Sequence, residues 1–328
     1  MTVEENVPIA PITTFCIGGP ARYFVRVTTV DELREALAFA KEKDLKPFVL
    51  GGGSNVLIDD AGFNGLVIKI ELMGVEQEGE ALIAGAGESW DVLVARAIEA
   101  GLWGIENLSG IPGTVGAAPV QNIGAYGTEI KDTLLWLEAL DMQTGEVVRF
   151  ANAECGFGYR TSVFKREPRR YVIMRVALQL KKDGHAQASY KDLGGMDSAT
   201  IAQIRAKVLD IRAGKFPDLS VEGTAGSFFL NPVVSVEQAG QLASKYAGMP
   251  QFAVAGGVKL SLAWLLDNAL GLKGTAVGGA RLYEKQPLVI AAARNTPARD
   301  VRALADLVAQ KIKDECKIDV EQEVRVIV

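Results

Sequence analysis

Residues 109–127, Ser-Gly-Ile-Pro-Gly-Thr-Val-Gly-Ala-Ala-Pro-Val-Gln-Asn-Ile-Gly-Ala-Tyr-Gly, show neither helical nor strand periodicity and are rich in glycine and alanine. Ordering a glycine costs conformational entropy, so such a segment predicts positive φ angles or a close approach of the main chain to something else. A second stretch of this kind, Gly51-Gly52-Gly53-Ser54-Asn55, follows the apolar run 47–50. Together the glycine-rich segment 109–127 and the glycine tract 51–55 predict a large, flat or anionic ligand enclosed by main chain.

The composition is that of a globular protein with two or three domains: 328 residues, 48% of them hydrophobic and 23% charged. A net charge of −5 and the lack of a dense basic patch argue against a nucleic-acid partner. The most apolar helix candidate, 260–272, is too short to span a bilayer and contains Asp267, so no membrane partner is expected. An N-terminus without a signal sequence and three widely spaced cysteines indicate a cytoplasmic protein with reduced thiols.

The single histidine limits the chemistry that is open to this chain. His185 lies in Lys-Lys-Asp-Gly-His, a sequence typical of an exposed turn, and no Cys/His cluster has the spacing of a zinc site. We therefore expect no metal centre and no Ser-His-Asp triad in a protected site. Acid–base chemistry must use Ser, Tyr, Lys, Arg, Asp or Glu.

Periodicity predicts a mixed α and β chain with a boundary at 213–225, where Gly, Pro and Asp interrupt the pattern. Strands are predicted over 21–28, 46–50, 66–70, 81–84, 134–142, 146–150, 171–180 and 320–328. Helices are predicted to begin at Thr29 and to cover 90–100, 198–212, 236–246, 261–270 and 297–316. For the last of these, the hydroxyl of Thr296 followed by Pro297 is a typical helix start.

The glycine tract 51–55 follows a predicted strand, where successive N–H groups form an anion-binding nest. It matches neither the dinucleotide-binding G-x-G-x-x-G pattern nor a P-loop with its lysine, so a phosphate site and a plain tight turn both stay open. The segment 109–127 favours the phosphate site, because one ligand with a pyrophosphate and a flat ring accounts for both glycine-rich stretches.

Two polar residues, Arg160 and Ser227, have neighbours that make them candidates for ligand binding or catalysis. Arg160, among glycines and aromatic residues, suits a carboxylate or phosphate, or else a structural ion pair. Ser227, between small residues and two phenylalanines, could give a proton to a basic carbanion, or simply bond to the main chain. Periodicity alone does not single out Glu323, on the last predicted strand.

In this order the motifs resemble those of the UDP-N-acetylenolpyruvoylglucosamine reductase family, over essentially the whole chain. The resemblance rests on the following segments: Thr13-Thr14-Phe15 with Gly18-Gly19, the glycine tract 51–55, residues 111–116 and 121–127, Gly158-Tyr159-Arg160, Gly226-Ser227-Phe228-Phe229, and Glu323-Val324-Arg325. Residues 189–193, Ser-Tyr-Lys-Asp-Leu, look like the tyrosine loop of the family's longer form.

The resemblance implies an α+β fold: a two-lobed FAD-binding fold of the vanillyl-alcohol-oxidase/PCMH type, with a C-terminal α/β substrate-binding domain. The expected divisions are lobe 1 over 1–70, lobe 2 over 71–217 and the substrate-binding domain over 218–328. It also implies a cytoplasmic, monomeric enzyme with non-covalent FAD. NADPH reduces the FAD, and the enolpyruvyl ether of a UDP-sugar is then reduced to UDP-N-acetylmuramate for peptidoglycan synthesis.

The resemblance also assigns roles to residues of this sequence. Ser227 is the expected proton donor, and Arg160 and Glu323 the expected pair at the substrate carboxylate. The expected FAD-binding residues are Gly51, Gly52, Gly53, Ser54, Asn55, Pro112, Gly113, Thr114, Gly116, Ala117, Gln121, Asn122, Gly124 and Ala125. The expected substrate-binding residues are Tyr126, Tyr190, Lys215, Asn231 and Gln286. Leu230 departs from the family, many of whose members have lysine there.

Two other functions fit the same sequence features. One is a flavin-dependent alcohol or lactone oxidase on the same scaffold. Many such oxidases tether FAD through histidine, for which His185 is badly placed. The other is a nucleotide-binding scaffold without enzymatic activity, since a fold does not fix a function.

Overall fold

The computed structural model describes all 328 residues, which form two compact units. Unit 1 comprises Met1–Val7, Ala21–Gly53 and Phe63–Ala213, and unit 2 comprises Pro8–Pro20, Ser54–Gly62 and Gly214–Val328. The chain therefore contributes two short early segments to the unit that holds its C-terminal third. The expected division into two lobes and a third domain stays a prediction. None of the helices is both long and apolar enough to cross a membrane.

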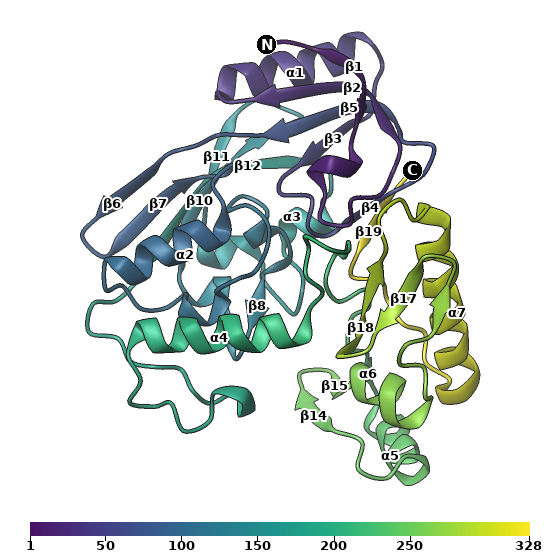
Figure 1. Ribbon diagram of the computed structural model, residues 1–328. Helices are drawn as coiled ribbons and strands as arrows, with labels where there is room; N and C mark the ends of the chain where they lie inside the picture. The colour runs from purple at the N-terminus through teal and green to yellow at the C-terminus, as the bar shows by residue number, and fades with distance from the viewer. The chain divides into compact units, whose positions relative to one another are not determined.

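Unit 1 begins with a four-stranded sheet and the helix that crosses it (Figure 1). Its strand order is β1 (Glu4–Pro8), β2 (Pro20–Val27), β5 (Phe63–Ile70) and β3 (Pro47–Leu50), and β5 runs parallel to both β2 and β3. Helix α1 (Val30–Glu42) connects β2 to β3. As predicted, it begins after Thr29, whose hydroxyl accepts a hydrogen bond from Glu32 N at 3.2 Å.

A five-stranded antiparallel sheet forms the larger part of unit 1. Its order is β11 (Val147–Ala151), β10 (Leu134–Asp141), β12 (Tyr171–Gln179), β7 (Ala81–Gly85) and β6 (Val75–Glu78). Helix α2 (Trp90–Glu99) packs on it through Trp90, Leu93 and Val94, which share one buried cluster with side chains of β7, β10 and β12. The predicted hairpin β10–β11 and strand β12 are confirmed.

The rest of unit 1 is irregular chain with short elements and one long helix, α4. These are η2 (Glu106–Leu108), η3 (Ala118–Gln121), β8 (Gly124–Ala125), β9 (Thr128–Glu129), η4 (Ile130–Asp132), η5 (Asn152–Cys155), α3 (Val163–Arg166), η6 (Lys191–Leu193) and α4 (Ile201–Lys215). Ile204 and Val208 of α4 pack with Tyr126 and Leu193 in a small separate cluster. The glycine-rich segment 109–127 therefore lies in the irregular part of the unit, as its lack of periodicity predicts.

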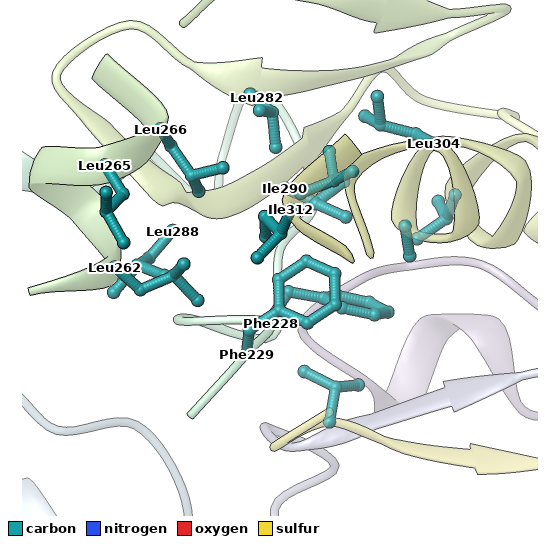
Figure 2. Close-up of a cluster of buried hydrophobic side chains, with 14 of the residues drawn as sticks. Phe228, Phe229, Leu262, Leu265, Leu266, Leu282, Leu288, Ile290, Leu304 and Ile312 are labelled. Carbon is teal, nitrogen blue, oxygen red and sulfur yellow. The ribbon is translucent and has the colours of Figure 1, made fainter. Parts of the chain in front are cut away.

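Unit 2 holds three small sheets and three helices around one hydrophobic core. Its sheet orders are β13 (Val233–Val234)–β15 (Gly257–Leu260)–β14 (Gln251–Val254), β16 (Ala276–Val277)–β17 (Ala280–Tyr283)–β18 (Gln286–Ala292), and β19 (Arg325–Ile327)–β4 (Val56–Ile58). Its helical elements are η1 (Ala10–Ile12), α5 (Val236–Lys245), α6 (Leu262–Trp264) with the π-helical turn η7 (Leu265–Ala269), and α7 (Ala298–Cys316). Figure 2 shows the two rings of Phe228 and Phe229 within this core, near Ile290 and Ile312.

Two predictions for unit 2 were wrong in detail. The last strand covers only Arg325–Ile327, because residues 321–323 pair instead with the chain around Phe229: Leu230 N donates to Glu321 O at 2.9 Å. Helix α7 begins at Ala298, and Thr296 does not cap it, since its hydroxyl donates to Ala293 O. The cap is the carboxylate of Asp60, distant in sequence, which accepts hydrogen bonds from Ala298 N and Arg299 N.

Candidate functional site

The structure brings the two side-chain-poor stretches of unit 1 together. A Cβ on Gly52 would lie 2.6 Å from Gly113 Cα, and one on Gly51 would lie 2.7 Å from Thr114 Oγ1 and 3.2 Å from Ala117 Cβ. At these two positions glycine is therefore needed for contact between two stretches of the protein's own chain. The expected FAD contact of Gly51 and Gly52 stays a prediction; what the structure adds is that a Cβ at either position would meet residues 113–117.

Other glycines of these stretches serve the turn geometry. Gly53 and Gly113 have φ angles of +64° and +127°, in a region that disfavours other residues. Gly116 packs so closely on Ala86 that a Cβ would lie 2.4 Å from the Cβ of that alanine. At Gly124 a Cβ would lie 2.8 Å from Glu129 Cγ. Residues 51–53 and the segment 109–127 thus form one tightly packed main-chain layer within unit 1.

Thr114 is the polar side chain in this layer with unused bonding capacity. It is 8% exposed, and its Oγ1 is buried with no hydrogen-bond partner in the protein. A buried hydroxyl without a partner costs about 1–3 kcal/mol, so a bound group that reaches it would recover that cost. Lys69 Nζ donates to Gly51 O beside it, and burial lowers the pKa of this lysine.

Asn122 is committed to the protein. Its Nδ2 donates to Glu129 Oε2 at 2.9 Å and to Gly158 O at 3.1 Å, and its Oδ1 accepts from Lys131 N at 3.2 Å. Both amide protons are therefore used, and its φ of +47° makes it the left-handed residue that ends η3. Any contact of Asn122 with a cofactor would come from its main chain. Its neighbour Gln121 is half-buried, whereas Pro112, in the preceding turn, is exposed.

Arg160 is held against the same segment. Its Nη2 donates to Gly124 O at 2.8 Å and its Nη1 to Asn122 O at 3.4 Å. Lys165 Nζ donates to the carbonyl of Arg160, whose φ is +52°. The guanidinium thus lies beside β8, which carries Gly124 and Ala125.

The tyrosine candidates meet edge to face in unit 1. The rings of Tyr126 and Tyr190 are 5.5 Å apart between centroids with planes at 90°, the arrangement that aromatic pairs prefer. Tyr126 is 8% exposed and Tyr190 44%, so Tyr190 presents the accessible surface of the pair. Arg212 of α4 is half-buried, and burial lowers its pKa, although its electrostatic interaction with the Tyr126 side chain opposes the shift.

Unit 2 places Ser227 and Glu323 on neighbouring segments. Ser227 pairs with Val289 of β18 on one side, and on the other side Glu323 N donates to Phe228 O at 2.8 Å. The turn before the serine depends on Gly226, whose φ is +78°. Phe228 and Phe229, both 1% exposed, fix the segment in the core (Figure 2), so a change of register would cost buried apolar surface.

Asn55 belongs to the same part of unit 2. Its Nδ2 donates to Glu323 O at 3.1 Å, and its carbonyl accepts from Arg325 N. Asn55 and Ser54 therefore fall in unit 2, while Gly51–Gly53 fall in unit 1. The side chain of Asn55 supports the main chain of the predicted catalytic glutamate.

The remaining candidates of unit 2 are spread around it. Asn231 Oδ1 accepts from Leu262 N at 3.0 Å, at the start of α6. Gln286 begins β18, and Lys215 is the half-buried last residue of α4. Leu230 is also half-buried.

Sequence reasoning missed Asn107, a fully buried residue of η2. Its Nδ2 donates to the carbonyls of Tyr126 and Gln187. No spacing or motif marks it, because both acceptors are main-chain atoms far along the sequence.

Comparisons with known proteins find matches to both parts of the chain. Residues 21–151 match the FAD binding domain family, and residues 218–327 match the family described as UDP-N-acetylenolpyruvoylglucosamine reductase, C-terminal domain. The UDP-N-acetylenolpyruvoylglucosamine reductase of Pseudomonas syringae pv. tomato is 40% identical over 98% of both chains. That of Escherichia coli K12 is 39% identical over 98% of this chain and 96% of the relative. The crystal structure of the reductase from Thermus caldophilus matches with a TM-score of 0.73 and 29% identity, covering 100% of both chains.

Proposed function

The chain belongs to the family of UDP-N-acetylenolpyruvoylglucosamine reductases, FAD-dependent oxidoreductases of peptidoglycan precursor synthesis, and on that premise we propose how its residues perform the reaction. The substrate is the enolpyruvyl ether of UDP-N-acetylglucosamine and the product is UDP-N-acetylmuramate. NADPH is the reductant.

The residues of unit 1 fit a dinucleotide cofactor. The glycine layer offers main chain without side chains, and Thr114 Oγ1 is a buried hydroxyl that lacks a partner. We assign FAD binding to the layer around Gly51–Gly53, Pro112–Thr114 and Gly116–Ala117, to Gln121, Asn122, Gly124 and Ala125, and to Ser54 and Asn55 of unit 2. FAD held by these residues would supply the hydride transfer from NADPH to the vinyl carbon of the substrate. The negative charge that develops on the carbon next to the substrate carboxylate has to be stabilised, and that carbon has to be protonated.

Arg160 supplies the cation for that carboxylate. Its guanidinium donates to Gly124 O and Asn122 O, and these bonds fix the orientation of the guanidinium before substrate arrives. A preorganised donor stabilises developing charge without reorganisation during the reaction. Arginine is suited to this, because its planar fork matches a carboxylate.

Ser227 supplies the proton. Its Oγ–H is a weak acid towards water but sufficient towards a carbanion, and solvent can restore the proton afterwards. Glu323 assists at the carboxylate end of the substrate. The observation that carries the assignment is the bond between Glu323 N and Phe228 O, which fixes the register of the glutamate against the serine segment.

The remaining residues bind the sugar nucleotide. Tyr190 covers the uridine end, together with Tyr126. Lys215, Asn231 and Gln286 hold the diphosphate and the sugar. Leu230 stands where many members of the family have lysine, so this protein either binds the diphosphate more weakly or compensates for the missing cation elsewhere.

Half-reaction kinetics test the assignment of Ser227. The purified protein should be yellow, and Ser227→Ala should leave flavin reduction by NADPH intact. The same variant should slow reoxidation by the sugar nucleotide by roughly two to four orders of magnitude, the range for lost general-acid catalysis. Ser244→Ala is the matched control, because its exposed hydroxyl bonds only within α5, to Gly240 O. Equal slowing of both half-reactions by Ser227→Ala would refute the role of proton donor.

The proposal also covers the setting of the enzyme: a monomer, in the cytoplasm, without a nucleic-acid partner. The three cysteines support the cytoplasmic location, since all of them are free thiols. Light scattering of the flavin-loaded protein should give the mass of one chain, and a dimer mass would overturn that part.

A further inference from the structure

We propose that Asn107 is a positioning residue for the substrate: it fixes the Tyr126 turn and the base of the Tyr190 loop to each other. The inference rests on the proposed function of the two tyrosines in binding the sugar nucleotide. Asn107 itself is too deeply buried to touch a substrate, since its exposed fraction is zero.

The amide of Asn107 makes two hydrogen bonds to distant parts of unit 1. Nδ2 donates to Tyr126 O at 3.0 Å and to Gln187 O at 2.9 Å. Because both neighbours are carbonyl acceptors, the nitrogen and not the oxygen must face them. One side chain thus holds two segments that are 61 residues apart in sequence.

The first of these segments needs a restraint. Tyr126 has a φ of +49° and Gly127 one of +84°, so two successive residues adopt left-handed conformations. A tyrosine in this region is disfavoured by contact of its Cβ with the main chain, and persists where its surroundings hold it. The bond from Asn107 to the carbonyl of Tyr126 provides such a hold at the strained residue.

The second segment leads directly to Tyr190. Gln187 lies three residues before it, in a stretch without helix or strand, and Ala186 and Ala188 pack in the same small cluster as Tyr126. With Gln187 O fixed, the loop starts at a defined place relative to the Tyr126 ring. The edge-to-face contact of Tyr126 and Tyr190 is the result.

The side-chain oxygen of Asn107 indicates that this residue is not selected for stability alone. Asn107 Oδ1 is buried without a hydrogen-bond partner, which costs stability. Glu106, the preceding residue, is also buried, and its carboxylate accepts from Gly104 N at 2.7 Å, which helps to shape the turn that presents Asn107. The turn tolerates an orphaned oxygen while it keeps both N–H bonds.

Steady-state and half-reaction kinetics on the flavin-loaded enzyme test the proposal. Asn107→Ala and the milder Asn107→Ser should raise the KM for the sugar nucleotide by about tenfold, the contribution of one or two hydrogen bonds of ordinary net strength. Flavin content and the rate of flavin reduction by NADPH should stay at wild-type values. Gln187→Ala is the matched control, because it retains the main-chain acceptor and removes only an exposed side chain. An unchanged KM in an active, folded Asn107→Ser enzyme overturns the inference.

A double-mutant cycle separates positioning from a general structural effect. If Asn107 acts through the tyrosine loop, Asn107→Ala should raise KM by a smaller factor in a Tyr190→Ala background than in the wild type. The same factor in both backgrounds would refute coupling through the loop.

Limited proteolysis gives a readout that does not depend on the reaction. Trypsin should cut Asn107→Ser faster than wild type at Lys181, Lys182 or Lys191, because a released loop opens locally more often. Gln187→Ala should be cut at the wild-type rate. No acceleration in Asn107→Ser refutes the anchoring, whereas a wild-type enzyme that fails to reduce the sugar nucleotide would refute the proposed function and leave the anchoring standing.

Discussion

Replacing Gly52 by alanine tests the close packing of the glycine tract on the glycine-rich segment. The new Cβ would lie 2.6 Å from Gly113 Cα and 3.0 Å from Gly113 C, and both are main-chain atoms. Neither is the end of a flexible side chain, so the two segments have to separate by roughly an ångström in a close-packed interior. Overpacking of this kind costs about 1–3 kcal/mol.

A loss of about 2 kcal/mol should lower the Tm by roughly 4–8 °C in a folding unit of this size. Because the displaced segment includes Thr114, the purified Gly52→Ala protein should also contain less FAD per chain. Calorimetry and the ratio of flavin to protein absorbance measure the two effects.

Gly240→Ala is the matched control for this substitution. Gly240 lies in the exposed interior of α5, and a Cβ added there would have nothing within 4 Å, so alanine should stabilise the protein by about 0.5–1 kcal/mol. The two Gly→Ala changes are therefore expected to have opposite signs. A Gly52→Ala protein with wild-type Tm and full flavin content would refute the reasoning.

Three further predictions concern stability and reactivity. Asp60→Ala should lower the free energy of unfolding by about 1–2 kcal/mol in denaturant titrations, as expected for loss of the cap on α7. A loss no larger than that of Asp319→Ala, an exposed ion-pair partner, would contradict this role. Burial raises the pKa of Glu106, so the folded state holds its proton more tightly and stability falls as pH rises from the ordinary glutamate value to the raised one. As the pH rises through this range, the free energy of unfolding of Glu106→Gln should therefore increase relative to that of the wild type. A difference in unfolding free energy that does not change with pH would contradict the prediction. Burial also raises the pKa of Cys155 to about 12, so a thiol reagent at pH 8 should label half-buried Cys16 first, and labelling of Cys155 in the native protein would count against the fold.

Local signals in the sequence were sufficient for most elements of unit 1. The hydroxyl of Thr29 and the apolar spacing of α1 are contained in a few consecutive residues, and so is the Gln-Thr-Gly turn of the β10–β11 hairpin. In unit 2 such signals predicted the helices α5 and α7, but they missed several strands. The β14–β15 hairpin and β18 were not predicted, because their strands are short and half-exposed, or uniformly apolar without alternation.

The cap of α7 shows why a helix start can be misread. Thr296 and Pro297 form the usual local signal, yet the acceptor is a carboxylate 238 residues away along the chain. A long-range partner leaves no trace in the residues next to the helix. Asn107 escaped notice for the same reason, since its acceptors Tyr126 O and Gln187 O are main-chain atoms that any residue provides.

The glycine tract illustrates a different limit. Sequence reasoning correctly connected residues 51–53 with residues 113–117, but on the argument that absent side chains leave room for a ligand. In the structure a Cβ on Gly51 would meet Thr114 and Ala117, and one on Gly52 would meet Gly113. The glycines at positions 51 and 52 therefore allow two main-chain segments to come close enough to form a single layer.

We expect a cofactor held by this layer to contact main-chain N–H groups and the Thr114 hydroxyl. Thr114→Val and Gly52→Ala should then differ in their effects on FAD binding and on unfolding. Thr114→Val removes the orphaned hydroxyl at nearly constant volume, so it should weaken FAD binding while leaving the unfolding of the cofactor-free protein unchanged or slightly improved. Gly52→Ala should weaken both, because it disturbs the layer itself. Equal behaviour of the two variants would mean that the hydroxyl and the packing cannot be assigned different roles.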